Sequence, residues 1–149
     1  MEKFDRFLKL KEFNIALECS ERALRIDSNS DQALSRKGRA LERLERYDEA
    51  ILCCEKALSL NSQNALAFFV KGNVFLNNLN KYNEAIKSYD MALAIDPNDA
   101  KALSNKGLAL SDLNKYNEAI KCYDMALAID PNHALALNNK KMAIESRKK

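Results

Sequence analysis

Apolar residues recur along the chain at helical spacing, in pairs of segments joined by short polar turns. The first segment of a pair places apolar or small residues at i, i+4 and i+7, as at Leu34, Gly38 and Leu41. The second segment opens on an alanine such as Ala50, with Cys or Tyr four residues later and Ala-Leu from the seventh. Residues at this spacing share one face of an α-helix. The pattern therefore predicts pairs of amphipathic helices along the whole chain.

The helix pairs repeat with a period of 34 residues. Leu79–Ala100 and Leu113–Ala134 are the same sequence except at two positions. Gly38, Gly72 and Gly107 follow one another at intervals of 34 and 35 residues. A period of this length is typical of arrays in which each supersecondary unit packs on the next.

The period predicts how the chain is organised. We expect a single array made of a shortened repeat (1–30), three full repeats (31–64, 65–99 and 100–133) and a closing helix (134–149). The shortened repeat should hold a short helix that ends at a turn near Lys11–Glu12, which brings the expected number of helices to nine. The middle repeat has one extra residue near Asn77–Asn78, which we expect to form a π-bulge or a longer turn.

These residues resemble the tetratricopeptide repeat, a helix–turn–helix unit of 34 residues. The last full repeat carries the family's pattern at Leu103, Gly107, Leu110, Ala119, Tyr123, Ala126 and Pro131. One departure is a lysine before each glycine, where the family usually has leucine: Lys37, Lys71 and Lys106. The resemblance implies an all-α, right-handed α-solenoid. It also implies a non-catalytic interaction scaffold that binds a peptide or helix of a partner protein in a concave groove.

In this family the first helices of successive repeats line the groove. Carried over position by position, the groove is basic in the first full repeat, at Arg36, Arg39 and Arg43. Its middle is an apolar cluster that we expect to be exposed, at Leu66, Phe69 and Val70. Further positions carry amides or a lysine: Asn73, Lys101, Asn105 and Asn139. The same stripe also includes Leu108, Ser111, Asp112, Leu135 and Met142.

Some family members hold a chaperone's C-terminal carboxylates with two lysines, an arginine and two asparagines. In one register of this chain only Lys101 matches that set, and in the next register only the asparagine pair of Asn73 and Asn105 matches. The cations that neutralise carboxylates are therefore missing. We expect the partner to be a different peptide.

Two alternatives come from other functional classes. The first is a self-assembly module, in which the apolar residues Phe4, Phe7 and Leu8 at the N-terminal edge pair with a second copy as a homodimer. The second is a nucleic-acid binder, which the sequence disfavours because the arginine stripe belongs to one repeat only. A net charge of +3, from 24 basic and 21 acidic residues, does not demand a polyanionic partner.

Candidate chemistry is sparse in the 149 residues. The single histidine, His133, lies in a turn and reads as a solvated surface residue, and no nucleotide-binding, zinc-protease or Cys-x-x-Cys motif is present. We therefore expect no catalytic residues, no metal and no cofactor. The four cysteines follow the repeat and read as small packing residues that stay reduced. With no signal peptide and no apolar run of membrane-spanning length, we expect a cytoplasmic location.

Overall fold

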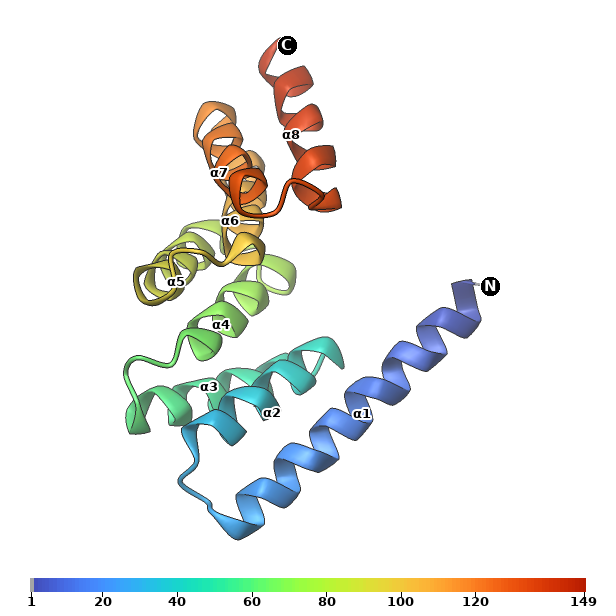
Figure 1. Ribbon diagram of the computed structural model, residues 1–149, viewed down its shortest axis with the longest axis vertical. Coiled ribbons are helices and arrows are strands. Elements are labelled where there is room, and N and C mark those ends of the chain that lie inside the picture. The colour runs from blue at the N-terminus through green and yellow to red at the C-terminus, as the bar shows by residue number, and fades with distance from the viewer. Residues whose placement is uncertain (1) are drawn as a thin grey trace. The chain divides into compact units, whose positions relative to one another are not determined.

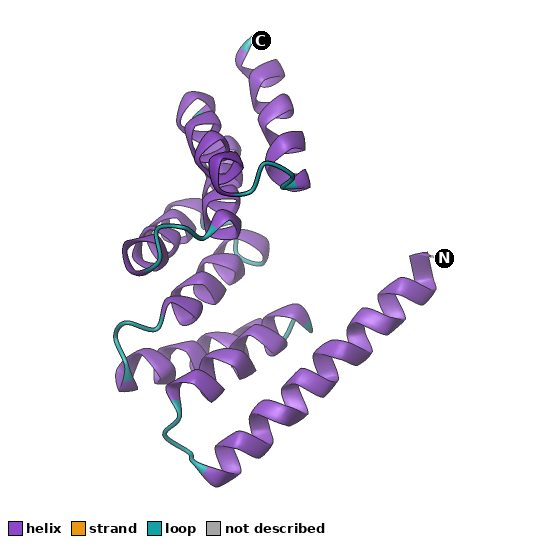
Figure 2. Cartoon of the chain, viewed as in Figure 1, coloured by secondary structure: helices purple, strands orange, loops and turns teal. Residues whose placement is uncertain are grey.

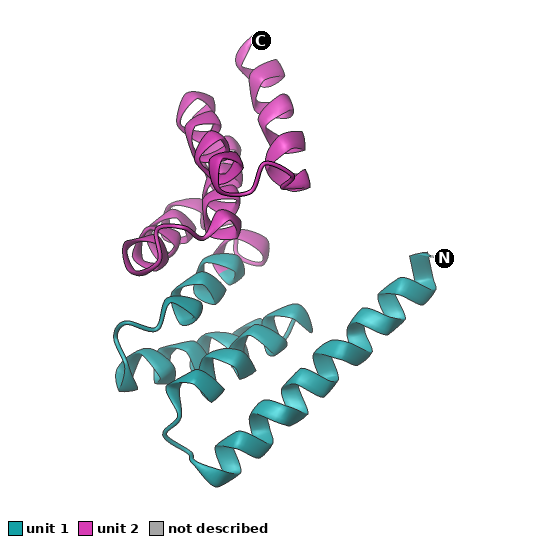
Figure 3. Ribbon diagram, viewed as in Figure 1, with its two compact units in different colours: residues 1–74 teal, residues 75–149 magenta. Residues whose placement is uncertain are grey.

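The computed structural model describes residues 2–149, and every regular element in this range is an α-helix (Figures 1 and 2). The helices are α1 (Glu2–Ile26), α2 (Asp31–Arg43), α3 (Tyr47–Leu60), α4 (Ala65–Asn77), α5 (Tyr82–Ile95), α6 (Ala100–Asp112), α7 (Tyr116–Ile129) and α8 (Ala134–Arg147). The chain divides into two compact units, Met1–Val74 and Phe75–Lys149, with the boundary inside α4 (Figure 3). We call them unit 1 and unit 2.

The N-terminal helix α1 is continuous over 25 residues. The expected turn near Lys11–Glu12 is therefore wrong, and residues 2–149 hold eight helices instead of nine. The segment from Glu2 to Ile26 contains neither glycine nor proline, so nothing local breaks the helix. A continuous helix pairs the backbone groups of its interior within itself, whereas a separate folded-back helix of ten residues would add two more helix ends and would need tertiary contacts to form.

The turns between paired helices share one backbone device. Glu45, Asn80 and Asn114 have positive φ angles of 61°, 48° and 61°, which reverse the chain after the first helix. The turn before α5 has four residues, where the turns before α3 and α7 have three. The extra residue of the middle repeat therefore forms a longer turn, which confirms one of the two expectations and excludes the π-bulge.

In unit 1, α2 packs between α1 and α3. Leu17 of α1, Leu41 of α2 and Ala50 of α3 meet in one buried cluster, which Ala40 and Val74 complete. Leu41 and Ala50 have no exposed surface. Burial of these apolar side chains holds the helices together, at roughly 25 cal/mol for each Å² removed from water.

In unit 2, Tyr123 of α7 fills the space between helices and is fully buried. Its ring needs a glycine on the facing helix, because a Cβ atom at Gly107 would lie 2.6 Å from Tyr123 Cε1. Helices α6 and α7 can therefore approach closely because Gly107 has no side chain. The rest of this core consists of Leu103, Leu110, Ala119, Cys122, Ala126, Ala136 and Ala143.

Polar turn residues cap the first helix of each pair. Ser30, Asp99 and His133 accept hydrogen bonds from the first-turn amides of α2, α6 and α8 respectively. His133 is therefore a helix cap, in contrast to the solvated role that its position in the sequence suggests. Asn64 caps α4 and also donates to Ser35 Oγ at 3.1 Å, which ties the start of α4 to α2.

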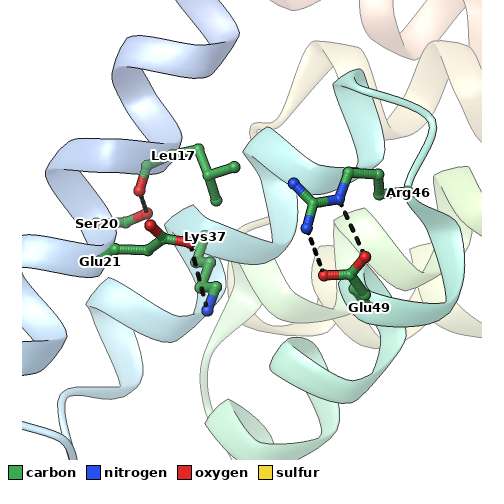
Figure 4. Close-up of polar contacts among 6 residues, drawn as sticks. All are labelled: Leu17, Ser20, Glu21, Lys37, Arg46 and Glu49. Atoms are coloured by element: carbon green, nitrogen blue, oxygen red, sulfur yellow. Dashed lines mark hydrogen bonds and ion pairs between the residues drawn. The ribbon is translucent and has the colours of Figure 1, made fainter.

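The lysines that depart from the family pattern have acidic partners. Each lysine ion-pairs with a carboxylate on the helix that precedes its own, at 3.8 Å for Lys37–Glu21 (Figure 4) and 2.6 Å for Lys106–Asp90. The same pair recurs at Lys71–Glu55 and Lys140–Asp124. These acidic residues were not among the predicted ones, although they recur at the repeat period and lie 16 residues before each lysine. Each lysine ammonium thus contacts a carboxylate, while the aliphatic part of the lysine side chain covers apolar surface.

Candidate functional site

The predicted basic stripe lies on the surface of α2 in unit 1. Arg36, Arg39 and Arg43 are all exposed, as the sequence led us to expect. The guanidinium carbon of Arg43 lies 5.1 Å from the ring centroid of Phe13 on α1, a cation–π distance. The other two arginines leave their charges on the same helix face, where they favour an acidic ligand.

Glu42 lies between these arginines in the sequence but is buried, with 6% of its surface exposed. Burial raises the pKa of Glu42, while the hydrogen bond from Asn73 and the nearby charges of Arg43 and Arg39 lower it. The net pKa is raised, because removal from water disfavours the charged form more than these contacts favour it. Asn73 is itself buried, so it belongs to the packing between α2 and α4 and does not form an open groove wall.

A cleft of about 420 Å³ separates the N-terminal part of α1 from the end of α2. Asp5, Lys9 and Leu10 line one side and Arg43 the other, with Phe13 between them. The cleft arises because α1 continues past the position where the other repeats turn. The cleft is lined by acidic, basic and apolar side chains together. This lining does not favour any one class of ligand.

The expected apolar cluster in the middle repeat is not exposed. Phe69 is 8% exposed and Val70 is fully buried, while Leu66 is half-buried. The expectation of a solvent-facing cluster is therefore wrong for Phe69 and Val70. Ser35 and Ser104, which hold the position of Phe69 in the neighbouring repeats, are also buried. This helix position faces the protein interior in each full repeat, so the side chain here serves packing.

In unit 2, the predicted groove positions converge on a pocket of about 300 Å³ between α6 and α8. Leu108, Asp112, Asn139 and Met142 line it together with the buried Tyr123. Met142 is 58% exposed. The sequence placed these lining residues on one stripe without showing that they enclose a space.

The pocket is lined by polar and apolar side chains in similar share, the apolar ones being Leu108, Met142 and Ala143. Ser111 Oγ and the Tyr123 hydroxyl lie 3.4 Å apart. Burial raises the pKa of Asp112 at the rim. Asn139 carries an amide that can both donate and accept a hydrogen bond. Such a pocket suits an apolar side chain of a ligand whose backbone bonds to the rim.

The remaining predicted residues are not among those that line this pocket. Lys101 is exposed near the start of α6, and Asn105 is half-buried one turn later. Phe4, Phe7 and Leu8 are exposed on α1 at 64%, 63% and 41%.

The thiols differ in environment. All four cysteines are free in the structure, but Cys19 is exposed, contrary to the packing role expected for it. Burial raises the pKa of Cys54 to about 12, which makes this thiol a poor nucleophile. Within residues 2–149, no three acidic, His or Cys side chains gather as a metal site would require.

None of the helices that the structure describes is both long enough and apolar enough to cross a membrane.

Comparison with known sequences matches the repeats directly. A sequence model of the tetratricopeptide repeat matches residues 32–64 and 100–133, and a second model, described as TPR repeat, matches residues 76–114. The chain belongs to the tetratricopeptide repeat family. It has the all-α solenoid fold of that family, as the solved structures below also show.

Similar proteins include a characterised relative and solved repeat domains. The TPR repeat-containing thioredoxin TDX of Arabidopsis thaliana is 34% identical over 85 residues, 56% of this chain. This chain spans only 22% of that relative's length. The first TPR of Spaghetti (RPAP3), solved with the HSP90 peptide SRMEEVD, is 28% identical with a TM-score of 0.76, covering 83% of this chain and 97% of that one. MamA superposes with a TM-score of 0.77 at 22% identity, over 97% of this chain and 78% of that one.

Proposed function

We propose that this protein is a non-catalytic interaction scaffold that binds an apolar anchor residue of a partner peptide or helix in the pocket between α6 and α8. Membership of the tetratricopeptide repeat family supports the scaffold role. A related repeat domain at 28% identity was solved with a bound peptide, which supports a peptide as the class of ligand. Four free thiols fit a reducing, cytoplasmic setting, which is part of the proposal.

One observation carries the choice of site. Leu108 and Met142 come from two different helices, yet both line the pocket together with the buried Tyr123 ring. Their apolar surface can desolvate a ligand side chain, while Asn139 supplies a backbone contact. Buried anchor residues provide most of the binding energy at such interfaces. With Phe69 and Val70 buried, the pocket takes the anchoring role that the sequence assigned to the middle repeat.

A selected peptide tests this proposal. A library of random peptides displayed on phage is selected against the protein, and the best peptide is titrated calorimetrically against variants. Met142→Ala should weaken its binding by about 1–2 kcal/mol, or roughly tenfold in Kd.

The matched control is Leu137→Ala, which removes an exposed leucine from the same helix, α8, outside the pocket. It should leave the Kd unchanged. Equal affinity for both variants, or failure to select any peptide, would contradict the pocket as the site.

A further inference from the structure

A stripe of exposed apolar residues runs along the face of α1 that is turned away from α2. Leu17 and Ser20, on the opposite face of the helix, are buried. The stripe consists of Phe4, Leu8, Ile15, Cys19 and Ile26, all exposed. Its spacing alternates four and seven residues, an 11-residue period of about 3.67 residues per turn, so the stripe stays on one side of the helix.

Ile15 distinguishes this helix from its counterparts in the other repeats. The second helices α3, α5 and α7 carry Glu49, Glu84 and Glu118 at the matching position, and all three are exposed. Only α1 has an apolar residue there, and it is 52% exposed. A large aliphatic side chain in place of a solvated carboxylate points to a surface that another apolar surface covers.

The charges beside the stripe select the partner and its orientation. Lys11 lies on one flank of the stripe and Glu12 on the other, midway between Leu8 and Ile15. In a parallel pair of α1 helices, opposite flanks of the two copies meet, so Lys11 of each copy faces Glu12 of the other. In an antiparallel pair, equal flanks meet and Lys11 would face Lys11. The helix is thus self-complementary in the parallel arrangement.

We propose that two copies of this chain associate through α1 as a parallel, two-fold symmetric helix pair. Phe4, Leu8 and Ile15 of one copy then pack against the same residues of the other. Cys19 of one copy lies next to Cys19 of the other. The contact is isologous and therefore closes as a dimer. It uses the helix face opposite α2 and none of the pocket residues of unit 2, so it is independent of the proposed peptide binding.

The first test is mass in solution, measured by sedimentation equilibrium over a concentration series. The wild type should approach twice the 16.9 kDa of one chain at high micromolar concentration. Ile15→Glu installs the residue that the other repeats carry, so it should keep the helical circular dichroism signal and raise the dimer Kd by about tenfold or more. The matched control, Leu52→Glu on exposed α3 surface, should dimerise as the wild type does.

A wild-type monomer at all concentrations, a mass that grows beyond the dimer, or an Ile15→Glu variant that still dimerises would each overturn the proposal. The third result would mean that another surface makes the dimer.

The second test concerns orientation. Mild oxidation with copper phenanthroline should link Cys19 to Cys19 of a second copy, and Cys19→Ser should abolish the linked dimer on a non-reducing gel. Lys11→Glu and Glu12→Lys should each weaken the dimer, because like charges then meet, whereas the double exchange should restore it. A dimer that resists cross-linking through Cys19, or a double exchange weaker than both single variants, would overturn the parallel arrangement.

Discussion

Glu42 shows how a single residue can connect the groove face of α2 to the interior. Its carboxylate is buried, accepts a hydrogen bond from Asn73, and lies close to the charges of Arg43 and Arg39. These contacts offset only part of the hydration free energy that the carboxylate loses on burial, so the pKa of Glu42 stays raised. A group whose folded-state pKa is raised stabilises the fold when protonated and opposes it when ionised.

Replacing this carboxylate should therefore change the pH dependence of stability in a defined direction. Because wild-type Glu42 gains protons as the pH falls towards the ordinary glutamate range of about 4.3, its unfavourable ionised form disappears there. Glu42→Gln should match or exceed the wild type in free energy of unfolding at pH 7.5, and this advantage should shrink as the pH approaches about 4. Urea denaturation at several pH values measures the difference.

Glu45→Gln is the control, since Glu45 is exposed three residues away. Its stability curve should run parallel to that of the wild type. A Glu42→Gln variant that is less stable than the wild type, with the largest loss at neutral pH, would contradict the expected direction. The ionised carboxylate would then stabilise the fold.

The two helices of a pair approach closely where a glycine on one helix faces a larger side chain on the other. On α6 the partner of the large Tyr123 ring is Gly107, and on α2 the partner of the smaller Cys54 is Gly38. In both pairs an added Cβ would come within 3 Å of the facing side chain. Glycine is unfavourable within a helix by about 1 kcal/mol relative to alanine, so its presence here reflects close packing of the helices.

Gly107→Ala tests this contact between α6 and α7. Overpacking against the buried ring should cost about 1–3 kcal/mol, which the better helix propensity of alanine offsets by up to about 1 kcal/mol. We expect a net loss in the free energy of unfolding, measured by chemical denaturation. Lys101→Ala, at an exposed site of the same helix, should change stability by less than about 0.5 kcal/mol. A Gly107→Ala protein as stable as the wild type would show that Tyr123 can move aside.

At the scale of the molecule, each compact unit presents its own surface. Unit 1 carries exposed arginines and the outward face of α1, whereas unit 2 carries the pocket between α6 and α8. The repeated lysine–carboxylate pairs occur in both units, between each first helix and the helix that precedes it. Partly exposed pairs of this kind contribute modestly to stability, about 0–1 kcal/mol each.

The whole chain can be tested with the peptide SRMEEVD, which was solved with the related domain. At two positions where carboxylate-binding relatives carry clamp residues, this chain has Ser35 and Val70, both of which are buried. We therefore expect a Kd weaker than about 1 mM in fluorescence anisotropy. The phage-selected peptide provides the positive control. Micromolar binding of SRMEEVD would show that other cations, such as Arg36 and Arg39, replace the clamp.

The helix pairs and their family were determined by the sequence alone. A 34-residue period in apolar and small positions is a local signal, since residues seven apart share a helix face in any context. The exposure of Arg36, Arg39 and Arg43 follows from the same local pattern, because a charged side chain on a helix face between core positions has water as its best environment.

Other features depended on neighbours that the local pattern does not contain. Whether α1 turns near Lys11–Glu12 depends on a partner for a folded-back segment, and whether Phe69 is exposed depends on what packs beside its helix. The pocket at Leu108 and Met142 requires two helices to leave space between them. Repetition specifies which residues share a helix face. The tertiary structure decides which of these faces are covered, because burial is a property of the surrounding elements and not of the residue.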